Sequence, residues 1–412
     1  MRFPLILTRR SRTLLWVMIT AGLSSALTSC LTSRSDTSDV AVRNVAPAYR
    51  PAAVPDEVRY PGGVAVAPRR AGQPVVQMEV NDMARYLAGM QGGAGAPLNR
   101  MRQNATWRLH EMRMEQLWNQ FDTRHLSKIR GFRRDISDVG SPGVLFYPFS
   151  GPDFVYADGL FPGARDYVLC GLEKVNPIPD PRTLAESDTA VSLMNLWGSL
   201  RTVLNYSYFI TKDMRTDFSQ GRYQGVLPRL YVFLARTGHT IQSVQPISLN
   251  GNPVKWSSNV SGVHIVARSS YGRRNLFYFS ANLANGGSGS RVMAFAKSRG
   301  TPVTFIKSAS YLLHDGGFSN LRNFILTNSR AIVQDPSGVP YRQFNTRSWD
   351  ITYYGNYVKT LDMFKRFYQP DLAAAYRSRT NRIQPLPFGV GYVNTPGATS
   401  MIVARKARAA RP

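Results

Sequence analysis

Cysteine is almost absent from this sequence, which holds only Cys30 and Cys170 in 412 residues. So few thiols exclude a disulfide framework and a cysteine-rich zinc site. Cys170 lies in the apolar run "YVLCGLE", which predicts a buried strand thiol, because a catalytic thiol prefers a partly exposed, electropositive setting. The histidines lack the H-x-x-x-H and H-E-x-x-H spacings of metal ligands, so we expect no metal and no cofactor.

A stretch long enough to span a membrane is also missing. The apolar run within the first 29 residues covers about 15 residues, whereas a spanning helix needs about 20. Four arginines precede or open this run and small residues end it, which is the three-part pattern of an export signal. We therefore predict a signal peptide over residues 1–29 that is removed.

The end of that signal, Leu27, Thr28, Ser29 and Cys30, resembles the bacterial lipobox. The resemblance implies that Cys30 carries acyl chains such as palmitate and becomes the N-terminus of a lipoprotein. Each buried methylene group contributes about 0.8 kcal/mol, so several chains would anchor the protein permanently. Leu31 replaces the Asp that resembles an inner-membrane retention signal, which favours the outer membrane of the cell envelope, facing periplasm or exterior. An ordinary signal peptide cut nearby is the alternative.

Acidic residues are scarce, because 25 Asp and Glu face 51 Lys and Arg, for a net charge of +26. Removal of the signal with its four arginines leaves +22. Such a field attracts polyanions and is screened beyond about 8 Å in physiological salt. In the cytoplasm the natural partner would be nucleic acid, but in the envelope it would be anionic lipids or acidic polymers. The alternative is that the arginines form only a solvated surface.

Catalytic and nucleotide-binding signatures are missing too. The sequence has no G-x-S-x-G elbow. The Gly-rich "ANGGSGSR" at 284–291 lacks both the Lys-Ser/Thr pair of a P-loop and the third Gly of a dinucleotide fingerprint. Whether the protein is an enzyme therefore stays open.

What the sequence does contain is a long stretch with helix and strand periodicity. Residues 30–104 predict a lipidated Cys and a flexible tether, because Ser, Ala, Pro and Gly are frequent there. Residues 105–405 predict a single large folded domain, and residues 406–412 a basic tail. Apolar residues at spacings of three, four and seven predict an amphipathic helix over 106–130.

Further elements follow from the same patterns. Helices are predicted over 183–219, 227–238, 318–329 and 360–379. The first stretch is expected to hold two helices with a break near residues 206–212, and the last is expected to be bent by Pro370. Strands are predicted over 143–149, 166–173, 240–250, 262–269, 275–283, 301–310, 331–335, 348–358 and 400–407, with turns over 150–164. Since no regular βαβ repeat is visible, we predict an α/β or α+β domain with a mixed sheet and several packed helices.

Three runs resemble those of an uncharacterised family of secreted or lipid-anchored bacterial envelope proteins. They are "FYPFSGPDFVYADGLFP" (146–162), "KSASYLLHDGGFSNLRNFILTNSRAIVQDPSGVPYRQF" (307–344) and "YGNYV" (354–358). The resemblance covers about residues 105–405. The family has no established activity, so the resemblance assigns no role to any residue.

Five polar residues in these runs are candidate site residues: Ser150, Asp153, Ser310, His314 and Asp335. They lie near the ends of predicted strands, where α/β sheets often place their chemistry. A serine, the histidine and a carboxylate could form a hydrolytic triad if they lie within hydrogen-bond distance. Turn chemistry is the alternative, because Ser-Gly-Pro-Asp and Asp-Pro-Ser-Gly are good turn sequences.

The basic charge and the missing catalytic signatures predict an envelope lipoprotein that binds an acidic partner. Its lipid would attach it to the membrane, and nucleic acid is not the expected partner. The alternative is a hydrolase that acts on an envelope polymer or ester, with His314 as the base, because an imidazole suits proton transfer near neutral pH.

Overall fold

The computed structural model describes residues 74–206, 221–257 and 260–407. Cys30, the signal peptide, most of the expected tether and residues 408–412 of the basic tail lie outside these ranges. Among the described residues, none of the helices is both long and apolar enough to cross a bilayer.

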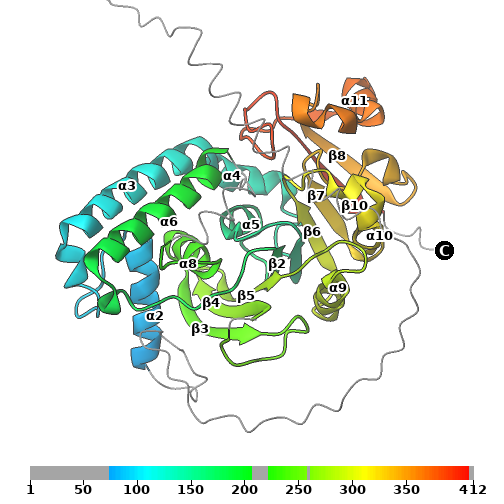
Figure 1. The fold of residues 1–412 in the computed structure, drawn as a ribbon. Helices are drawn as coiled ribbons and strands as arrows, with labels where there is room; N and C mark the ends of the chain where they lie inside the picture. The colour runs from blue at the N-terminus through cyan, green and yellow to red at the C-terminus, as the bar shows by residue number, and fades with distance from the viewer. Residues whose placement is uncertain (1–73, 207–220, 258–259, 408–412) are drawn as a thin grey trace, which may run out of the picture. The chain divides into compact units, whose positions relative to one another are not determined.

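A ten-stranded mixed sheet forms the centre of the described chain, with helices packed against it (Figure 1). Its strand order is β3 (Thr240–Ile247), β4 (Gly262–Ser269), β5 (Gly272–Ser280), β2 (Asp166–Gly171), β1 (Val144–Tyr147), β6 (Pro302–Ile306), β7 (Ala331–Gln334), β10 (Ser400–Lys406), β8 (Trp349–Gly355) and β9 (Ile383–Gln384). The prediction of an α/β domain with a mixed sheet is confirmed.

The helices divide between the two faces of this sheet. Their bounds are α2 (Pro74–Leu87), α3 (Ala105–Phe121), α4 (Ser127–Phe132), α5 (Phe154–Leu160), α6 (Glu186–Tyr206), α8 (Leu227–Arg236), α9 (Gly289–Ser298), α10 (Ser319–Asn328) and α11 (Pro370–Arg377). Buried residues of α2 to α8 belong to the first core, and those of α9, α10 and α11 to the second.

The five central strands, β5, β2, β1, β6 and β7, are parallel. The chain forms β1 first, adds β2 and then β5 on one side of it, and afterwards adds β6 and β7 on the other side. This is a doubly wound arrangement, in which the direction of strand addition reverses at β1. The expectation that no such repeat exists is therefore wrong. The repeat is hidden in the sequence because the chain inserts α6, α8, β3 and β4 between its second and third parallel strands.

Side chains alternate along the central strands and so build both cores. In β1, Leu145 and Tyr147 lie in the first core, whereas Val144 and Phe146 lie in the second. Because both faces are covered, the buried parts of the parallel strands read as short apolar runs, such as residues 144–147 of β1 and 276–279 of β5, and the sequence predicts the strands from these runs.

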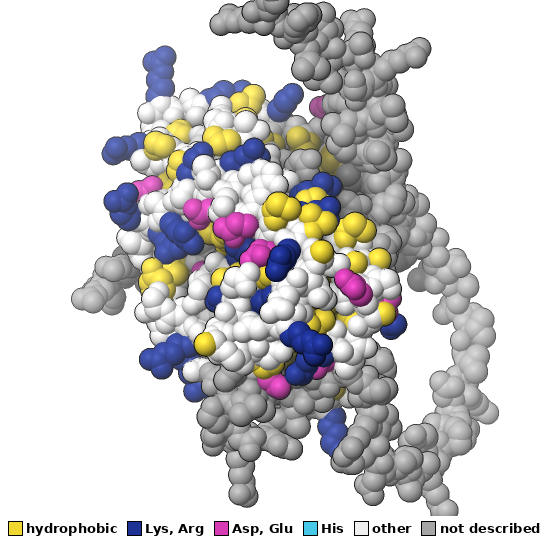
Figure 2. All heavy atoms as spheres, turned by 90° about the vertical axis from the view of Figure 1, so that its left-hand side faces the viewer, with side chains coloured by type: hydrophobic (Ala, Val, Ile, Leu, Met, Phe, Trp, Pro, Cys, Tyr) yellow, Lys and Arg dark blue, Asp and Glu magenta, His cyan; other side chains and the backbone are white. Residues whose placement is uncertain are grey.

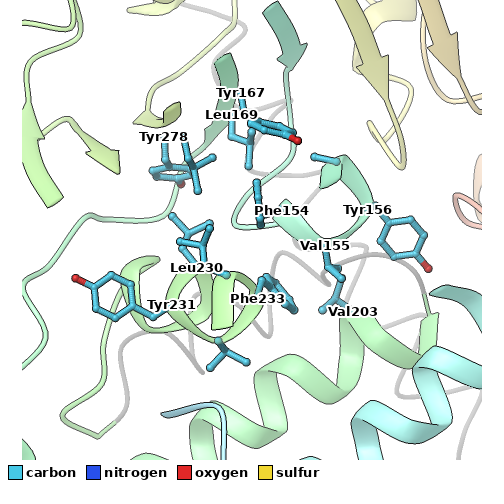
Figure 3. Packing of buried hydrophobic residues seen from close by; sticks show 14 of the residues in the cluster. Phe154, Val155, Tyr156, Tyr167, Leu169, Val203, Leu230, Tyr231, Phe233 and Tyr278 are labelled. Atoms are coloured by element: carbon cyan, nitrogen blue, oxygen red, sulfur yellow. The ribbon is translucent and has the colours of Figure 1, made fainter. Parts of the chain in front are cut away.

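The first core contains α5 between β2 and the helices α6 and α8 (Figure 3). Phe154 and Val155 of α5 lie beside Leu230 and Phe233 of α8. All seven residues of α5 are buried. The packing therefore fixes α5, and with it the loop that joins β1 to this helix.

Two local predictions are wrong. Residues 150–164, expected as turns, contain α5, because the Asp153 carboxylate caps the helix by accepting a hydrogen bond from the Tyr156 N–H. Pro370 does not bend a helix. It lies in the first turn of α11, where its missing N–H costs nothing, and a separate short helix, η8 (Asp362–Phe367), precedes it.

Part of the expected tether belongs to the folded unit. The helix α2 lies within residues 30–104, and its Tyr86 and Leu87 are buried in the first core. Asp82 of the same helix forms a buried ion pair of 2.7 Å with Arg102. The folded unit therefore begins before residue 105, and the predicted tether extends too far along the chain.

The amphipathic helix predicted over 106–130 is confirmed. α3 continues through a π-helical turn, η2 (Asp122–Leu126), into α4, with Trp107 and Met114 buried. α8 is confirmed as well, and Gly238, with a φ of 79°, follows its last turn as expected.

The two outermost strands are irregular. β9 contains two residues. β3, at the other edge, has a register shift between Ile241 and Ser243, which is a β-bulge.

Candidate functional site at the carboxyl end of the sheet

The strand order reverses at β1, which places β2 on one side of it and β6 on the other. In doubly wound sheets the loops from the carboxyl ends diverge at such a point, and ligands bind in the crevice between them. In this chain the corresponding loops are residues 148–153 after β1, 307–311 after β6 and 335–338 after β7.

Lys307 is the central charge of this region. Its side chain is 1% exposed, and its ammonium nitrogen lies 2.8 Å from Oδ2 of Asp153. The same ammonium group lies 3.8 Å from the centre of the Tyr156 ring. The Tyr147 hydroxyl donates to the Asp153 oxygen over 2.8 Å. Burial lowers the pKa of Lys307, while the carboxylates of Asp153 and Asp335 act in the opposite direction.

Asp335, the first residue after β7, is the other buried carboxylate near Lys307, besides Asp153. Its Oδ2 accepts a hydrogen bond from the Ser308 N–H over 2.9 Å, and its Oδ1 accepts from the N–H and the hydroxyl of Ser337. Burial raises the pKa of Asp335, opposed by these hydrogen bonds and by Lys307. Gly391 passes so close that an added Cβ would lie 1.9 Å from Oδ2. The carboxylate is therefore enclosed by three separate segments.

The loops after β1 and β6 have an unusual backbone. Ser308, Ser310 and Tyr311 have φ values of 54°, 50° and 57°, and Phe149 has a φ of 60°. Within the described ranges these are the non-glycine residues in the left-handed region, and such strain persists only where the surroundings hold it. The Tyr392 hydroxyl holds the β6 loop, because it accepts from the Ser310 N–H and donates to the Ser308 carbonyl.

Aromatic rings cover the β6 loop. Tyr311 stacks on Phe367 with ring centres 5.0 Å apart and an angle of 2° between the planes. Phe364, which lies with Phe367 on the short helix η8, contacts Tyr311 as well, and its ring centre lies 4.7 Å from that of Tyr392. These contacts fix η8 over the carboxyl end of β6.

The region leaves little internal space. The cavity described beside Asp335, Gln369 and Tyr376 has a volume of about 10 Å³, which is room for about one water molecule. A larger ligand would therefore bind on the outside of these loops, unless the loops move.

Two of the five sequence candidates, Asp153 and Asp335, meet around Lys307, which the sequence patterns did not indicate. A signal for Lys307 does exist. Lys307 is a single charged residue directly after an apolar strand. Alternate side chains of this strand, Val303 and Phe305, point into the first core, so the next residue in the alternation, Lys307, is expected to point to the same side, where α5 lies.

Ser150 and Ser310 have other partners. The Ser150 hydroxyl accepts from the Cys170 N–H and donates to the Cys170 carbonyl, each over 3.1 Å, and so ties the β1 loop to β2. Cys170 is a buried strand thiol as predicted, and burial raises its pKa. The Ser310 hydroxyl lies 2.8 Å from the Tyr392 hydroxyl.

His314 lies in an aromatic environment. Its ring contacts Tyr311 and Phe367, with centroid distances of 5.2 and 5.7 Å, and its buried Nε2 atom has no hydrogen-bond partner among the described groups. Burial lowers its pKa to about 4. The hydrogen bonds among the described residues do not connect it to any of the other four candidates.

An exposed basic surface lies directly outside this region. We call residues 359–382 the basic segment; it contains η8, α11 and the loop that follows. Gln369 in its middle donates to the Pro336 carbonyl over 2.9 Å and accepts from the Tyr341 N–H over 2.7 Å, which anchors the segment beside the β7 loop. Its exposed basic side chains are Lys359, Lys365, Arg366, Arg377, Arg379 and Arg382, against two acids, Asp362 and Asp371.

No group of three or more His, Cys, Asp or Glu side chains in the described part of the chain could hold a metal ion. Comparison with protein-family models, with curated proteins and with solved structures finds no match to this chain. A function must therefore be argued from the geometry and charge of the residues themselves.

Proposed function

We propose that this chain is a bacterial envelope lipoprotein whose folded domain binds an acidic envelope polymer through the basic segment. Its six exposed basic side chains support this proposal, because none of them forms an ion pair with a carboxylate among the described residues. Cationic groups without a carboxylate partner keep their field and attract polyanions.

The support beneath the basic segment favours binding over catalysis. Lys307 pairs with Asp153 inside the protein, Asp335 accepts hydrogen bonds from Ser308 and Ser337, and the aromatic rings of η8 pack on the strained β6 loop. Such an arrangement holds a surface rigidly, and a rigid surface loses less entropy when it binds. The envelope location rests on the export signal and on the lipobox-like residues that end in Cys30.

The binding proposal can be tested with immobilised lipopolysaccharide and cell-wall material at rising salt. We expect the wild-type chain to bind and to dissociate as salt increases, because screening weakens the attraction. The Lys365→Glu, Arg377→Glu, Arg379→Glu variant should bind at least about tenfold more weakly.

The matched control is Arg268→Glu, Arg273→Glu, Arg291→Glu, which changes the net charge equally at exposed positions outside the segment. We expect this control to bind within about twofold of the wild type at moderate salt, since screening makes charge effects local. Equal losses in the two variants, or binding that does not respond to salt, would contradict the assignment of the basic segment.

A hydrolase is the second candidate, and Ser308 is the residue that favours it. Its buried hydroxyl oxygen has no hydrogen-bond partner among the described groups, and its left-handed backbone lies two residues after the end of the parallel strand β6, a position similar to that of a strained nucleophile turn. A fluorophosphonate probe that labels the wild type and Ser310→Ala, and not Ser308→Ala, would favour the hydrolase. A wild-type chain that the probe does not label would count against it.

A further inference from the structure

The helices α3 and α6 form a layer whose outer surface is partly apolar. Four of the nine large apolar side chains that are exposed in the described residues lie on these two helices. They are Leu109 (42% exposed), Met112 (61%), Val191 (47%) and Met194 (51%). Single exposed apolar residues are ordinary, but a group on adjoining elements indicates a binding surface.

The packing of the two helices places these side chains at similar positions along the helix axes. α3 and α6 pack side by side (Figure 1) and run in the same direction. Near their starts, the Thr106 hydroxyl lies 3.4 Å from the Glu186 carboxylate, and further along the Arg113 guanidinium lies 5.7 Å from the centre of the Trp197 ring. The four apolar side chains lie between these two positions, two on each helix. We call these four side chains the apolar strip.

Basic side chains flank this strip. Arg113 and Arg201 lie over the ring of Trp197, at 5.7 and 4.9 Å from its centre, and Arg108 is exposed beside Leu109. None of the three arginines forms an ion pair with a carboxylate in the described ranges. Figure 2 shows basic and apolar side chains interspersed on this side of the molecule.

The acidic residues nearby already have partners. Glu115 of α3 pairs with Arg236 over 2.6 Å, and Glu111 accepts a hydrogen bond from the Gln91 amide. Asp188 of α6 pairs with Arg222 over 3.0 Å. Glu111 and Glu186 are bonded to neutral groups and keep their negative charge, so three arginines face two uncompensated carboxylates on these two helices.

We propose that this α3–α6 face, the four apolar side chains with Arg108, Arg113, Trp197 and Arg201, docks on an anionic lipid bilayer. The arginines would contact lipid phosphates while the apolar side chains enter the boundary between headgroups and acyl chains, which is how peripheral amphipathic helices bind membranes. Trp197 adds an amphipathic ring that suits this boundary. A purely acidic polymer would use the arginines but not the apolar strip, so the combination favours a bilayer.

This inference depends on neither the basic segment nor the lipid on Cys30. It concerns a different group of residues, and it predicts membrane contact for a chain without acyl groups. The docking of the α3–α6 face on a bilayer and the binding of a polymer by the basic segment can therefore be contradicted independently of each other.

The test uses the full chain with Cys30→Ala, so that no acyl anchor contributes. Co-sedimentation measures binding to vesicles of phosphatidylcholine and phosphatidylglycerol at three to one, against phosphatidylcholine alone. We expect binding to the anionic vesicles and at least a tenfold loss for Met112→Glu, Met194→Glu. The matched control is Leu172→Glu, Val254→Glu, at exposed apolar positions outside the α3–α6 face, which should bind within twofold of the parent chain.

A second readout keeps the test valid if the double variant folds poorly. Met112→Cys carrying an environment-sensitive fluorophore should shift to the blue when anionic vesicles are added, whereas labelled Leu172→Cys should not. Binding unchanged by Met112→Glu, Met194→Glu, or no blue shift at residue 112, would overturn the proposal. Self-association lost in that variant without vesicle binding by the parent chain would also overturn it, since a second copy would then be the occupant.

Discussion

Among single residues, Lys307 decides how the carboxyl-end loops are held together. Its ammonium group lies 2.8 Å from Asp153 and is closed off from solvent. Lys307→Met keeps the size of the side chain but leaves Asp153 and Asp335 buried without their counter-charge. We expect the free energy of unfolding to fall by about 3–5 kcal/mol, measured by urea unfolding with circular dichroism.

Lys297→Met is the matched control, because Lys297 is exposed on α9 and its loss should change the free energy of unfolding by less than about 0.5 kcal/mol. Adding Asp153→Asn to Lys307→Met should restore part of the lost stability, since one uncompensated carboxylate is then removed. If Lys307→Met costs less than about 1 kcal/mol, the buried ion pair does not hold the loops.

At the scale of elements, the segment between β9 and β10 closes over the β7 loop. Gly391 in that segment has a φ of 74°, and a Cβ there would lie 1.9 Å from Oδ2 of Asp335. Gly391→Ala must therefore both adopt a strained φ and displace a carboxylate. We expect a loss of more than about 2 kcal/mol in the free energy of unfolding, measured in urea.

Gly397→Ala separates these two causes. Gly397 has a φ of 86°, but nothing lies within 4 Å of the position that a Cβ would take, so the substitution should cost only the backbone strain of about 1 kcal/mol. Similar losses at the two glycines would show that the contact with Asp335 has no energetic weight.

The sequence predicts the strands well and the site only in part. Buried parallel strands such as 144–147 and 302–306 are apolar except for Thr304 and are bounded by turn residues, so their pattern is local. α5 escapes prediction because Gly and Pro flank it and its capping Asp153 also fits a turn. The carboxylates could be found because they follow strands. Their meeting at Lys307 could not, because it requires β6 to pair with β1, and this strand order is a long-range property.

For the whole molecule, the histidines make stability depend on pH. All five lie in the described ranges, and burial lowers the pKa of each: to about 4 for His110, His125, His239 and His314, and below its ordinary value for His264. An unfolded chain takes up protons at these sites below about pH 6.5, while the folded chain stays neutral there until about pH 4. The free energy of unfolding should therefore fall as the pH drops from 6.5 toward 4.

Two carboxylates act in the opposite direction over part of this range. Burial raises the pKa of Asp158 to about 6 and also raises that of Asp335, so the folded state binds protons there before the unfolded state does. Because five histidines outweigh two carboxylates, we expect a net decrease in the free energy of unfolding as the pH falls. Urea midpoints at pH 7.0, 6.0, 5.0 and 4.5 measure it, and a midpoint that stays level or rises toward pH 4.5 would show that the histidines are not held neutral by the fold.

The irregular edge strands bear on how such a chain avoids aggregation. A long, flat edge strand offers unpaired N–H and C=O groups on which a second molecule can add its own strand. Here one edge is the two-residue β9, and the other is β3, which the bulge between Ile241 and Ser243 twists out of register. For a protein predicted to fold after export, beside other newly exported chains, these blunt edges favour completion of the sheet within one molecule over fibre-like growth between molecules.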